Sequence, residues 1–579
     1  MTMLTKWGAA LDRSCPLPEY PRPQLRRESF YNLNGVWDYA VTPSGDEPEV
    51  WDGEIVVPFS PEAPLSGAAR GPAKDEYLHY RRGFTLPEGF QKSRVLLHFG
   101  AVDQIAEVFV NGVCAAKHSG GYWPFSADIT SLLREGENIL RVTVRDNADD
   151  PTFAYGKQRY KRGGMWYTAQ SGIWQTVWLE SVPEVYVKSL RITPEFDEAR
   201  VRIELETALE SSAAITCDVR AADGSFVAGS WAKGGVCVVP LPGFRAWTPD
   251  DPYLYTLDIT CGEDRVESYF AMRKFSYVEL GGHKVFGLNN APLFHNGLLD
   301  QGYYPDGLLT PPSDEAMVND IDTMKRCGFN MLRKHIKIEP LRWYYHCDRL
   351  GMIVWQDMVS GGQPYSFLHV SALPTLGKVD LPDQDAKPYG RSGVLSRARF
   401  RREMADTVRL LYNCPCIALW TVFNEGWGQF DALDMANELK MLDPTRFIDH
   451  ASGWQDQGYE EMKSRHIYFR PVKLKNDGRA LALTEYGGYI LAVDGHRWTG
   501  KVFGYRICRN SAALAHDYEK LMLGQVLPHI RKEGLTAAVY TQITDVEEEL
   551  NGLMTYDREV LKIPEETLRE INAALRFDA

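Results

Sequence analysis

The sequence predicts a multidomain protein in which two β-sandwiches precede a (β/α)8 TIM barrel. The first 276 residues consist of short alternating strands separated by turns, which is typical of sandwich domains. From about residue 284, strands instead alternate with amphipathic helices, which indicates βα units around a parallel sheet. A chain of 579 residues has room for three or four domains at ~150 residues each. We place the predicted domains at 1–182, 183–276 and 277–579.

The first predicted sandwich contains six strands in which apolar and polar residues alternate. Asn111-Gly112 and Glu135-Gly136 lie between strands, as tight turns require. The predicted strands cover residues 35–41, 81–86, 95–99, 106–110, 139–144 and 176–179. One connection, residues 155–171, is long for a sandwich and rich in aromatic, glycine and basic residues. Two interpretations of it stay open: a surface tip, or a segment that reaches over the pocket of a neighbouring domain.

The second predicted sandwich has the same alternation and no residues that suggest chemistry. Its predicted strands cover residues 201–207, 214–220 and 255–260, and a proline-containing turn at 247–252 leads into the last of them. An immunoglobulin-like spacer of ~90 residues is the simplest interpretation.

The predicted barrel has eight strands, and helices follow most of them. The expected strands are 292–297, 330–335, 352–357, 417–425, 446–451, 466–469, 480–485 and 536–542; the expected helices are 313–327, 340–350, 396–411, 430–442 and 512–532. Ser313 is a candidate helix cap, and Pro528 a candidate kink. Eight parallel strands with intervening helices form a TIM barrel, whose active site lies at the carboxyl ends of the strands.

Polar residues occur at the carboxyl end of every predicted barrel strand. A purely structural strand end could carry serine or glycine equally well, so this set predicts a catalytic mouth. The residues are His295, Asn296, Arg333, His335, Gln356, Asp357, Asn424, Glu425, His450, Tyr468, Glu485 and Gln542.

Two glutamates at strand ends are the candidate catalytic pair. Residues 417–427 begin as an apolar stretch and then reach Asn424 and Glu425, while residues 480–487 repeat this plan with Glu485. One such glutamate alone would be interpreted as an ordinary acid capping a strand. Two carboxylates about 5 to 5.5 Å apart form the arrangement for glycoside hydrolysis with retention of configuration. We therefore predict that Glu425 and Glu485 converge on one anomeric carbon.

Their sequence neighbours suggest different roles for the two carboxyl groups. Phe423 and Trp427 flank Glu425, and an apolar setting favours the protonated form that a general acid needs. Glu485 precedes Tyr486, whose hydroxyl could hold a carboxylate nucleophile in place. Arg333 would keep that nucleophile charged, and Asn424 would donate a hydrogen bond to a sugar hydroxyl.

Other polar and aromatic residues near the strand ends receive weaker interpretations. Trp355, Trp427 and Trp454 could stack on a sugar, although a tryptophan beside a barrel strand more often belongs to the core. We interpret His450 and His466 as hydrogen-bonded packing residues rather than as catalysts.

Composition excludes several classes of function. The net charge is −13 and no run of five basic residues occurs, which argues against nucleic acid as a partner. We find neither a secretory signal nor an apolar run near ~18 residues, so we expect a soluble, cytoplasmic protein without a membrane partner. The ten cysteines lack CxxC or histidine-pair spacing, so we expect free core thiols, no metal and no cofactor.

The segments 420–427 (Trp-Thr-Val-Phe-Asn-Glu-Gly-Trp) and 483–487 (Leu-Thr-Glu-Tyr-Gly) resemble glycoside hydrolase family 2, the family of β-galactosidases, β-glucuronidases and β-mannosidases. Residues 107–112 and 171–177 resemble the family's sugar-binding jelly roll, and the middle module resembles its immunoglobulin-like domain. The resemblance implies that Glu425 is the acid/base and Glu485 the nucleophile. It implies a carbohydrate substrate, and a homo-oligomer is compatible with it.

Departures from the family pattern concern the substrate. The family's second strand carries Arg-(Thr/Leu)-Ser-His-Tyr-Pro, whereas this chain has Arg333-Lys-His-Ile-Lys, so His335 corresponds only approximately. The lysine of the Asn-x-Lys pair that β-glucuronidases use is replaced by Leu553, which disfavours a glucuronide. Tyr540 stands where members usually place a tryptophan, and would offer an aromatic face to the sugar. The metal ligands of larger β-galactosidases are not recognisable.

These observations predict a retaining exo-β-glycosidase of β-galactosidase type. The expected substrate-binding residues are Asn424, Arg333, His335, Asp357, Trp454, Tyr468, Tyr486 and Tyr540. The alternatives are glucuronide or mannoside specificity, or a non-catalytic carbohydrate-binding protein on the same scaffold. The loops at 155–171 and 360–391 are expected to shape the choice of substrate.

Overall fold

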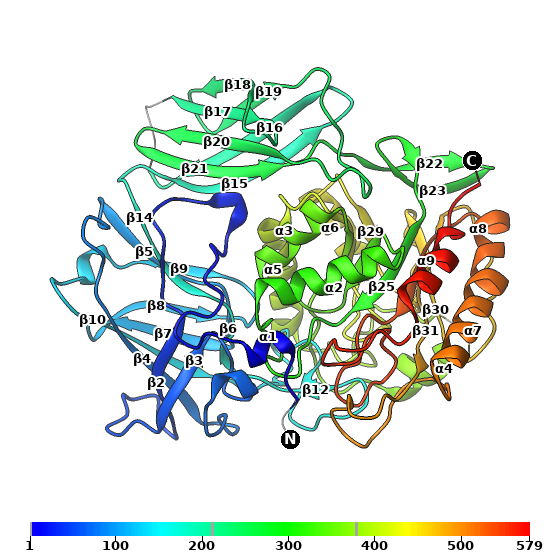
Figure 1. Ribbon diagram of the computed structural model, residues 1–579, viewed down its shortest axis with the longest axis horizontal. Helices are drawn as coiled ribbons and strands as arrows, with labels where there is room; N and C mark the ends of the chain where they lie inside the picture. The colour runs from blue at the N-terminus through cyan, green and yellow to red at the C-terminus, as the bar shows by residue number, and fades with distance from the viewer. Residues whose placement is uncertain (1–2, 210–213, 377–379, 579) are drawn as a thin grey trace.

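The computed structural model describes residues 3–209, 214–376 and 380–578. Two β-rich units and a barrel make up the molecule (Figure 1). The first unit, blue to cyan, lies beside the barrel, and the second lies above them. This arrangement confirms the predicted order of fold classes.

The first unit packs a six-stranded sheet against a four-stranded one around an apolar core. The larger sheet runs β3 (Gly53–Val57), β2 (Gly35–Thr42), β4 (Tyr77–Phe84), β10 (Asn138–Arg145), β7 (Ile105–Val110), β8 (Val113–Ser119). The smaller runs β1 (Tyr31–Asn32), β14 (Val177–Val182), β5 (Arg94–Phe99), β9 (Phe125–Asp128). Asn111 and Gly112 join β7 to β8 with φ of 51° and 84°, which is why a glycine-containing dipeptide was a good turn signal.

The second unit is a smaller sandwich. One sheet contains β15 (Val187–Glu195), β16 (Arg200–Thr207) and β19 (Val236–Pro240). The other contains β18 (Phe226–Ala232), β17 (Ile215–Arg220), β20 (Tyr255–Cys261) and β21 (Asp264–Phe270). Every second residue of β20 is buried, so the alternation that predicted this strand points its apolar side chains into the core.

A three-stranded sheet lies between the second unit and the barrel and was not expected. It comprises β22 (Phe275–Leu280), β23 (His283–Leu288) and β24 (Ala291–Pro292), so the predicted boundary at 276–277 falls inside β22. Phe286 of β23 is fully buried and stacks on Phe447 of the barrel at 4.2 Å between ring centroids. The sheet therefore contributes apolar side chains to the barrel core.

Eight parallel strands form the barrel sheet. Their order is β29 (Phe447–Asp449), β28 (Ile417–Thr421), β27 (Ile353–Asp357), β26 (Met331–Lys334), β25 (His295–Asp300), β34 (Leu535–Thr541), β31 (Ala480–Gly487), β30 (Met462–Ile467). The end strands β29 and β30 contact each other, and side chains bridge them. Ser464 Oγ donates to Asp449 Oδ1 at 3.0 Å, so a hydroxyl stands in for a backbone bond.

Helices surround the strands, but two crossovers lack one. The main helices are α2 (Asp314–Arg326), α3 (Leu341–Leu350), α5 (Val394–Leu411), α6 (Ala432–Leu442), α7 (Ser511–Leu521), α8 (Leu527–Glu533) and α9 (Glu565–Ala573). Ser313 caps α2 by accepting from the backbone N–H of Ala316, as predicted. A π-helical turn, η5 (Met522–Val526), separates α7 from α8 just before Pro528. Within the described residues, loops alone join β29 to β30 and β30 to β31.

Two strand assignments need correction because short apolar runs mark a strand's location better than its ends. The first barrel strand begins at His295, so His295 and Asn296 lie at its start and not at the catalytic end. His295 accepts from Trp355 Nε1 at 3.0 Å inside the barrel core. The sixth strand ends at Ile467, so Tyr468 follows it directly.

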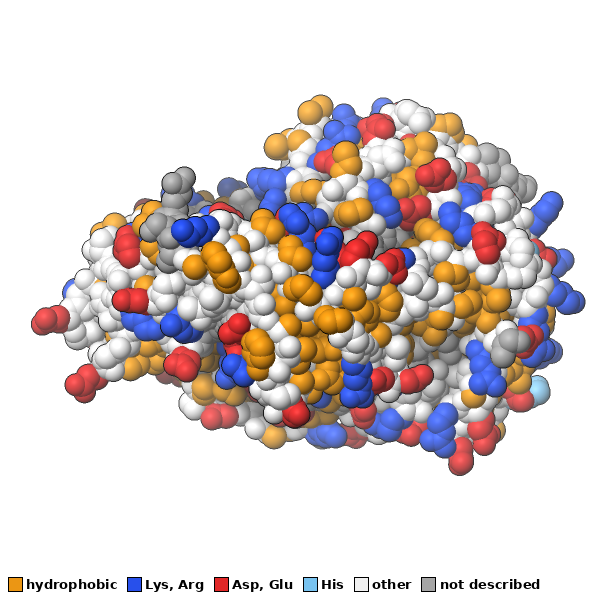
Figure 2. All heavy atoms as spheres, turned by 90° about the horizontal axis from the view of Figure 1, so that it is seen from above, with side chains coloured by type: hydrophobic (Ala, Val, Ile, Leu, Met, Phe, Trp, Pro, Cys, Tyr) orange, Lys and Arg blue, Asp and Glu red, His pale blue; other side chains and the backbone are white. Residues whose placement is uncertain are grey.

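The molecular surface carries charges of both signs. On the face seen in Figure 2, basic and acidic side chains both occur among hydrophobic ones. No helix in the described part of the chain has the length and apolar character to cross a membrane. Eight cysteines are buried as expected, whereas Cys15 and Cys114 are exposed.

Candidate active site

The two predicted glutamates meet at the mouth of the barrel. Glu485 lies in β31, and Glu425 lies four residues beyond the end of β28. A carboxylate oxygen of each and a ring nitrogen of His466 all lie within 4.8 Å of one another. The pairing inferred from two separate strand ends is therefore present in the structure.

Glu485 is held by two hydrogen-bond donors. Arg333 Nη1 lies 3.2 Å from Glu485 Oε1, and Tyr468 Oη donates to Oε2 at 2.5 Å. Its side chain is only 6% exposed. A guanidinium and a phenol on the two oxygens stabilise the ionised carboxylate and fix its direction.

Arg333 connects Glu485 to the neighbouring strands. Its Nε donates to Asp357 Oδ1 at 3.0 Å, and its Nη2 donates to Asn424 Oδ1 at 2.9 Å. Burial opposes the guanidinium charge, but Asp357 and Glu485 together raise the pKa of Arg333 above its usual value. Arg333 is thus a buried, permanently charged centre of the site.

Asp357 and His335 form the supporting layer beside Arg333. Asp357 Oδ2 lies 2.7 Å from His335 Nδ1, so both Asp357 oxygens have partners within the protein. Burial raises the pKa of Asp357, but Arg333 and His335 outweigh it and bring that pKa to about 2. Burial and the charge of Lys157 lower the pKa of His335. Asp357 therefore positions Arg333 and His335, rather than contacting substrate as predicted.

Glu425 lies in a less constrained setting. Its backbone φ is 56°, a left-handed conformation that is uncommon outside glycine, and its N–H donates to Ser452 O at 3.0 Å. Trp454 Nε1 donates to the Glu425 carbonyl at 2.7 Å. The side chain is 21% exposed, against 6% for Glu485. Burial raises the pKa of Glu425, although Lys157, His335 and Arg333 act against that rise.

His466 stands between the two glutamates, and sequence analysis undervalued it. Its Nδ1 lies 2.8 Å from Glu425 Oε1 and 3.6 Å from Glu485 Oε2. Burial lowers its pKa to about 3, so the imidazole is neutral at ordinary pH. His466 is paired with Glu485 on the neighbouring strand β31, whereas it meets Glu425 only because the ends of the barrel sheet come together. No sequence signal marked this residue.

Two tyrosines predicted to bind substrate point away from the site. Tyr486 follows Glu485 in a strand, so its side chain projects to the opposite face, where its hydroxyl contacts Met522 Sδ at 3.1 Å. Tyr540 packs against Tyr486 and Tyr518 on the same outer side. Both are fully buried, so the predicted contacts are wrong, and Tyr468 supplies the hydroxyl on Glu485 instead.

The loop 155–171 of the first β unit lies on the barrel. The backbone N–H groups of Tyr155 and Gly156 donate to Ser360 O at 3.1 and 2.9 Å. Trp166 packs edge-on against Trp427, with 5.1 Å between the ring centroids. Trp427 is two residues after Glu425 in the sequence. This segment therefore packs against the barrel loops that follow β27 and β28, and it is not a free surface tip.

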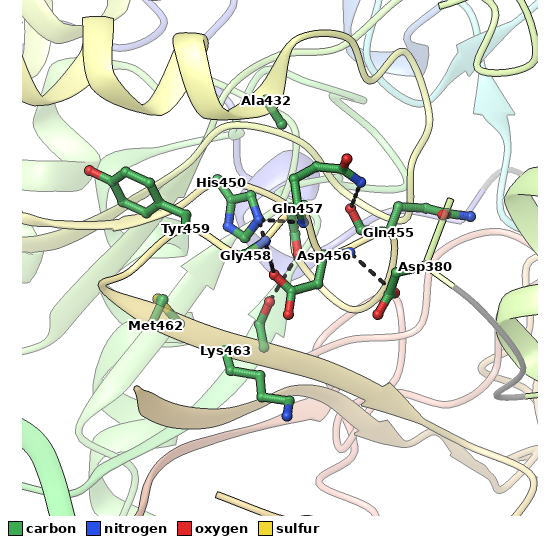
Figure 3. A network of polar contacts seen from close by, with 12 residues as sticks. Asp380, Ala432, His450, Gln455, Asp456, Gln457, Gly458, Tyr459, Met462 and Lys463 are labelled. Carbon is green, nitrogen blue, oxygen red and sulfur yellow. Dashed lines mark hydrogen bonds and ion pairs between the residues drawn. The ribbon is translucent and has the colours of Figure 1, made fainter. Parts of the chain in front are cut away.

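Asp380 and Leu381, in the second part of the predicted loop 360–391, bind the segment that follows Trp454 through the polar network in Figure 3. Asp456 N donates to Asp380 Oδ1 at 3.2 Å, and Gln457 Nε2 donates to Leu381 O at 2.9 Å. His450 Nε2 accepts from Gln457 N at 3.0 Å and lies 3.2 Å from Asp456. His450 thus organises this loop, as a hydrogen-bonded packing residue.

Two groups of side chains have ligand spacing for a metal ion among the described residues. The first is the catalytic cluster Glu425, His466 and Glu485; the second is His496, Asp557 and Glu559. In the first group, Arg333 Nη1 lies 3.2 Å from Glu485 and 3.4 Å from His466 Nε2. The fixed positive charge of Arg333 would repel a metal ion bound by these three side chains.

Three models of one family match the chain in domain order. The model "Glycosyl hydrolases family 2, sugar binding domain" matches residues 64–183, "Glycosyl hydrolases family 2" matches 185–273, and "Glycosyl hydrolases family 2, TIM barrel domain" matches 311–473. The chain belongs to glycosyl hydrolases family 2. The matches cover more than half of its residues and include Arg333, Glu425 and His466.

Relatives within family 2 carry different names. The chain is 23% identical to a β-galactosidase of Halalkalibacterium halodurans over 78% of this chain and 45% of the relative. It is 22% identical to a β-glucuronidase of Paenibacillus borealis over 82% of this chain and 85% of that one. The structure of an uncultured Clostridium sp. β-glucuronidase matches with a TM-score of 0.74 and 18% identity, covering 95% and 99% of the chains. The chain thus spans less than half the length of β-galactosidases that it matches.

Proposed function

We propose that this protein is a retaining exo-β-glycosidase that removes a terminal β-linked sugar from small glycosides or oligosaccharides. The observation that carries the proposal is the approach of the Glu425 and Glu485 carboxylates to within 4.8 Å. Inverting enzymes need room for a water molecule between sugar and base, and their carboxylates stand about 6.5–9.5 Å apart. The shorter separation favours direct attack by one carboxylate.

In the first step, Glu485 attacks the anomeric carbon from the face opposite the leaving group. Glu425 gives its proton to the glycosidic oxygen as the C–O bond breaks, so the aglycone leaves as a neutral alcohol. The product is an α-linked ester between the sugar and Glu485. The raised pKa of Glu425 suits the acid that this step requires.

In the second step, the Glu425 carboxylate removes a proton from water, and the resulting oxygen nucleophile attacks the anomeric carbon. The ester bond to Glu485 breaks, the carboxylate returns, and the sugar leaves with its original β configuration. Arg333 and Tyr468 stabilise the departing Glu485 carboxylate. Asn424 offers its amide N–H groups to a sugar hydroxyl because Arg333 already occupies its oxygen.

The sugar is the finer part of the proposal. Sequence analysis predicts a β-galactosidase-like preference, because Leu553 replaces the lysine expected of β-glucuronidases. A uronide is the second candidate, because Lys157 supplies a cation at the mouth from another domain. Relatives named β-galactosidase and relatives named β-glucuronidase both support the reaction class.

The experiment is a panel of nitrophenyl β-glycosides combined with an anomer assay. We expect release of nitrophenol from at least one of the galactoside, glucoside, mannoside and glucuronide, and its loss in Glu485→Gln. Proton NMR should detect the β-anomer of the free sugar before mutarotation. An α-anomer appearing first would exclude retention. If the panel and oligosaccharides are all left intact by the unaltered protein, the carbohydrate-binding alternative gains the support instead.

A further inference from the structure

Lys157 belongs to the first β unit but its backbone is fixed against the barrel mouth. Tyr167 N donates to Lys157 O at 2.9 Å, and the preceding Gly156 N donates to Ser360 O at 2.9 Å. A Cβ at Gly156 would lie 3.0 Å from the carbonyl oxygen of Ile336, directly after His335. Lys157 is therefore held close to the carboxyl ends of β26 and β27.

The Lys157 ammonium group remains accessible, although most of the residue is buried. The residue is 8% exposed, and Nζ lies 5.7 Å from the centre of the Trp166 ring. Nζ makes no hydrogen bond or ion pair with any residue among 3–209, 214–376 and 380–578. Arg333, by contrast, is paired with both Asp357 and Glu485.

The charged and titratable groups that face Lys157 come from three parts of the barrel. Its positive charge lowers the pKa of Glu425, of His335 and of Glu549, in each case against or beside the effect of burial. Glu549 follows β34 and accepts a hydrogen bond from Tyr167 Oη. The charge of Lys157 thus acts on the acid/base, on His335 and on a second buried carboxyl group.

An accessible ammonium group that has no carboxylate or carbonyl partner in the protein is free to bind an anion that enters the site. We propose that Lys157 is a substrate-binding residue that recognises the carboxylate of a uronic acid in the enclosed sugar subsite. This inference rests on the proposed glycosidase function and names its substrate class. In this chain, the cation that recognises the uronic acid would come from the first β unit. The barrel position where β-glucuronidases carry that lysine is Leu553.

The burial of Lys157 decides which end of the substrate it contacts. In an exo-acting enzyme the terminal sugar enters the closed end of the site, while the aglycone extends toward solvent. Only 8% of Lys157 is exposed, so we place its side chain beside the terminal sugar rather than beside the aglycone. A lysine ammonium group is a compact point charge that can bind one carboxylate. A charge-assisted hydrogen bond to that carboxylate then replaces the water molecules around the ammonium group.

The test compares sugars that differ only at C6. We would measure kcat/KM for the nitrophenyl β-glucuronide against the β-glucoside, and for the β-galacturonide against the β-galactoside. The full-length protein should prefer one uronide over its neutral counterpart. Lys157→Gln should lower that uronide-to-neutral ratio by about 100-fold or more, since it removes one member of a buried charge pair. Lys157→Arg should retain part of the preference.

Lys161→Gln is the matched control, since Lys161 lies exposed in the same loop. It should leave the ratio unchanged. An unchanged ratio in Lys157→Gln would overturn the inference and assign Lys157 to tuning Glu425 or holding Glu549. A parent that prefers the neutral sugar in both pairs would also overturn it, while leaving the glycosidase function intact. Cleavage of no glycoside would instead remove the proposed function itself.

A second measurement does not depend on the variant folding. The unaltered protein should be inhibited more strongly by D-glucaro-1,5-lactone, which carries a carboxylate, than by D-glucono-1,5-lactone, which does not. The difference should shrink at high ionic strength, because charge recognition is screened. Equal inhibition by both lactones would contradict a carboxylate site at Lys157.

Discussion

The ends of β28 and β31 present the same side chain in opposite ways. Glu485 lies inside a regular strand, 6% exposed, with a donor on each oxygen. Glu425 lies beyond its strand in a left-handed turn, 21% exposed, with neutral His466 as its nearest polar partner. The contacts of Glu485 hold a carboxylate in one orientation. The setting of Glu425 favours a protonated carboxyl group that can exchange its proton with a leaving group or with water.

We infer from this contrast that the geometry around a strand end determines which role a carboxyl group can take. A strand residue inherits its direction from the sheet, which suits an atom that must meet an anomeric carbon in line. A turn residue depends on contacts such as Trp454 Nε1 to its carbonyl. Variants at and around the two positions can show whether these settings correspond to nucleophile and acid/base.

The largest effect is expected for Glu485→Ala, which removes the attacking group. Turnover should fall by about 10⁴-fold or more for any cleaved glycoside, because the covalent route is lost. Added azide should restore activity and yield the α-glycosyl azide, since the small anion attacks from the side of the missing carboxylate. Formation of the β-glycosyl azide would reverse the two assignments.

Glu425→Ala should be less damaging, and its effect should depend on the leaving group. General acid catalysis contributes ~10²–10⁴-fold, so phenols that leave poorly should lose that much in kcat/KM. Dinitrophenyl glycosides need little protonation and should keep near-normal formation of the glycosyl-enzyme. Azide should here give the β-glycosyl azide. A loss independent of leaving-group pKa, measured over a series of aryl glycosides, would argue against the acid role.

The sequence predicted the fold classes and this glutamate pair because both depend on local patterns. Alternation in β20, the helix cap at Ser313 and two apolar runs ending in glutamate are all visible in a short window. Tyr486 and Tyr540 were misplaced because they were judged by their position at a strand end and not by the alternation of side chains, which turns the residue after Glu485 to the outer face. His466 reaches Glu485 through strand pairing and Glu425 through barrel closure, and Lys157 comes from another domain, so no local pattern could place either residue.

Arg333→Met should affect both activity and stability. Arg333 contacts Glu485, Asp357 and Asn424, so its loss leaves Asp357 and Glu485 buried without their cation. We expect unfolding free energy to fall by ~3–5 kcal/mol and kcat to fall by ~10²-fold. Chemical denaturation and steady-state kinetics measure the two effects. An unaffected kcat would show that Tyr468 alone can orient the nucleophile.

The pH profile separates the two strand ends without removing either carboxyl group. Catalysis needs Glu425 protonated, and burial raises its pKa above that of an ordinary glutamate, so kcat/KM should fall as pH rises through that value. Lys157 lowers this pKa, so Lys157→Gln should move the alkaline limb to higher pH for every substrate. This common shift is distinct from the loss of uronide preference. An alkaline limb that persists in Glu425→Gln would belong to another group.

The smallest effect is expected at Tyr468, and Tyr486 provides its control. Tyr468→Phe removes one hydrogen bond from Glu485 while Arg333 remains, so kcat should fall by only ~10-fold, near the lower range for a bond to a charged group. Tyr486→Phe alters the residue next to Glu485 in sequence, but its hydroxyl contacts Met522 on the outer face. It should leave kcat unchanged and report only on packing, through the melting temperature. If instead Tyr486→Phe impaired turnover and Tyr468→Phe did not, the strand would present its opposite face to the substrate, and the contrast between the two glutamates would lose its structural basis.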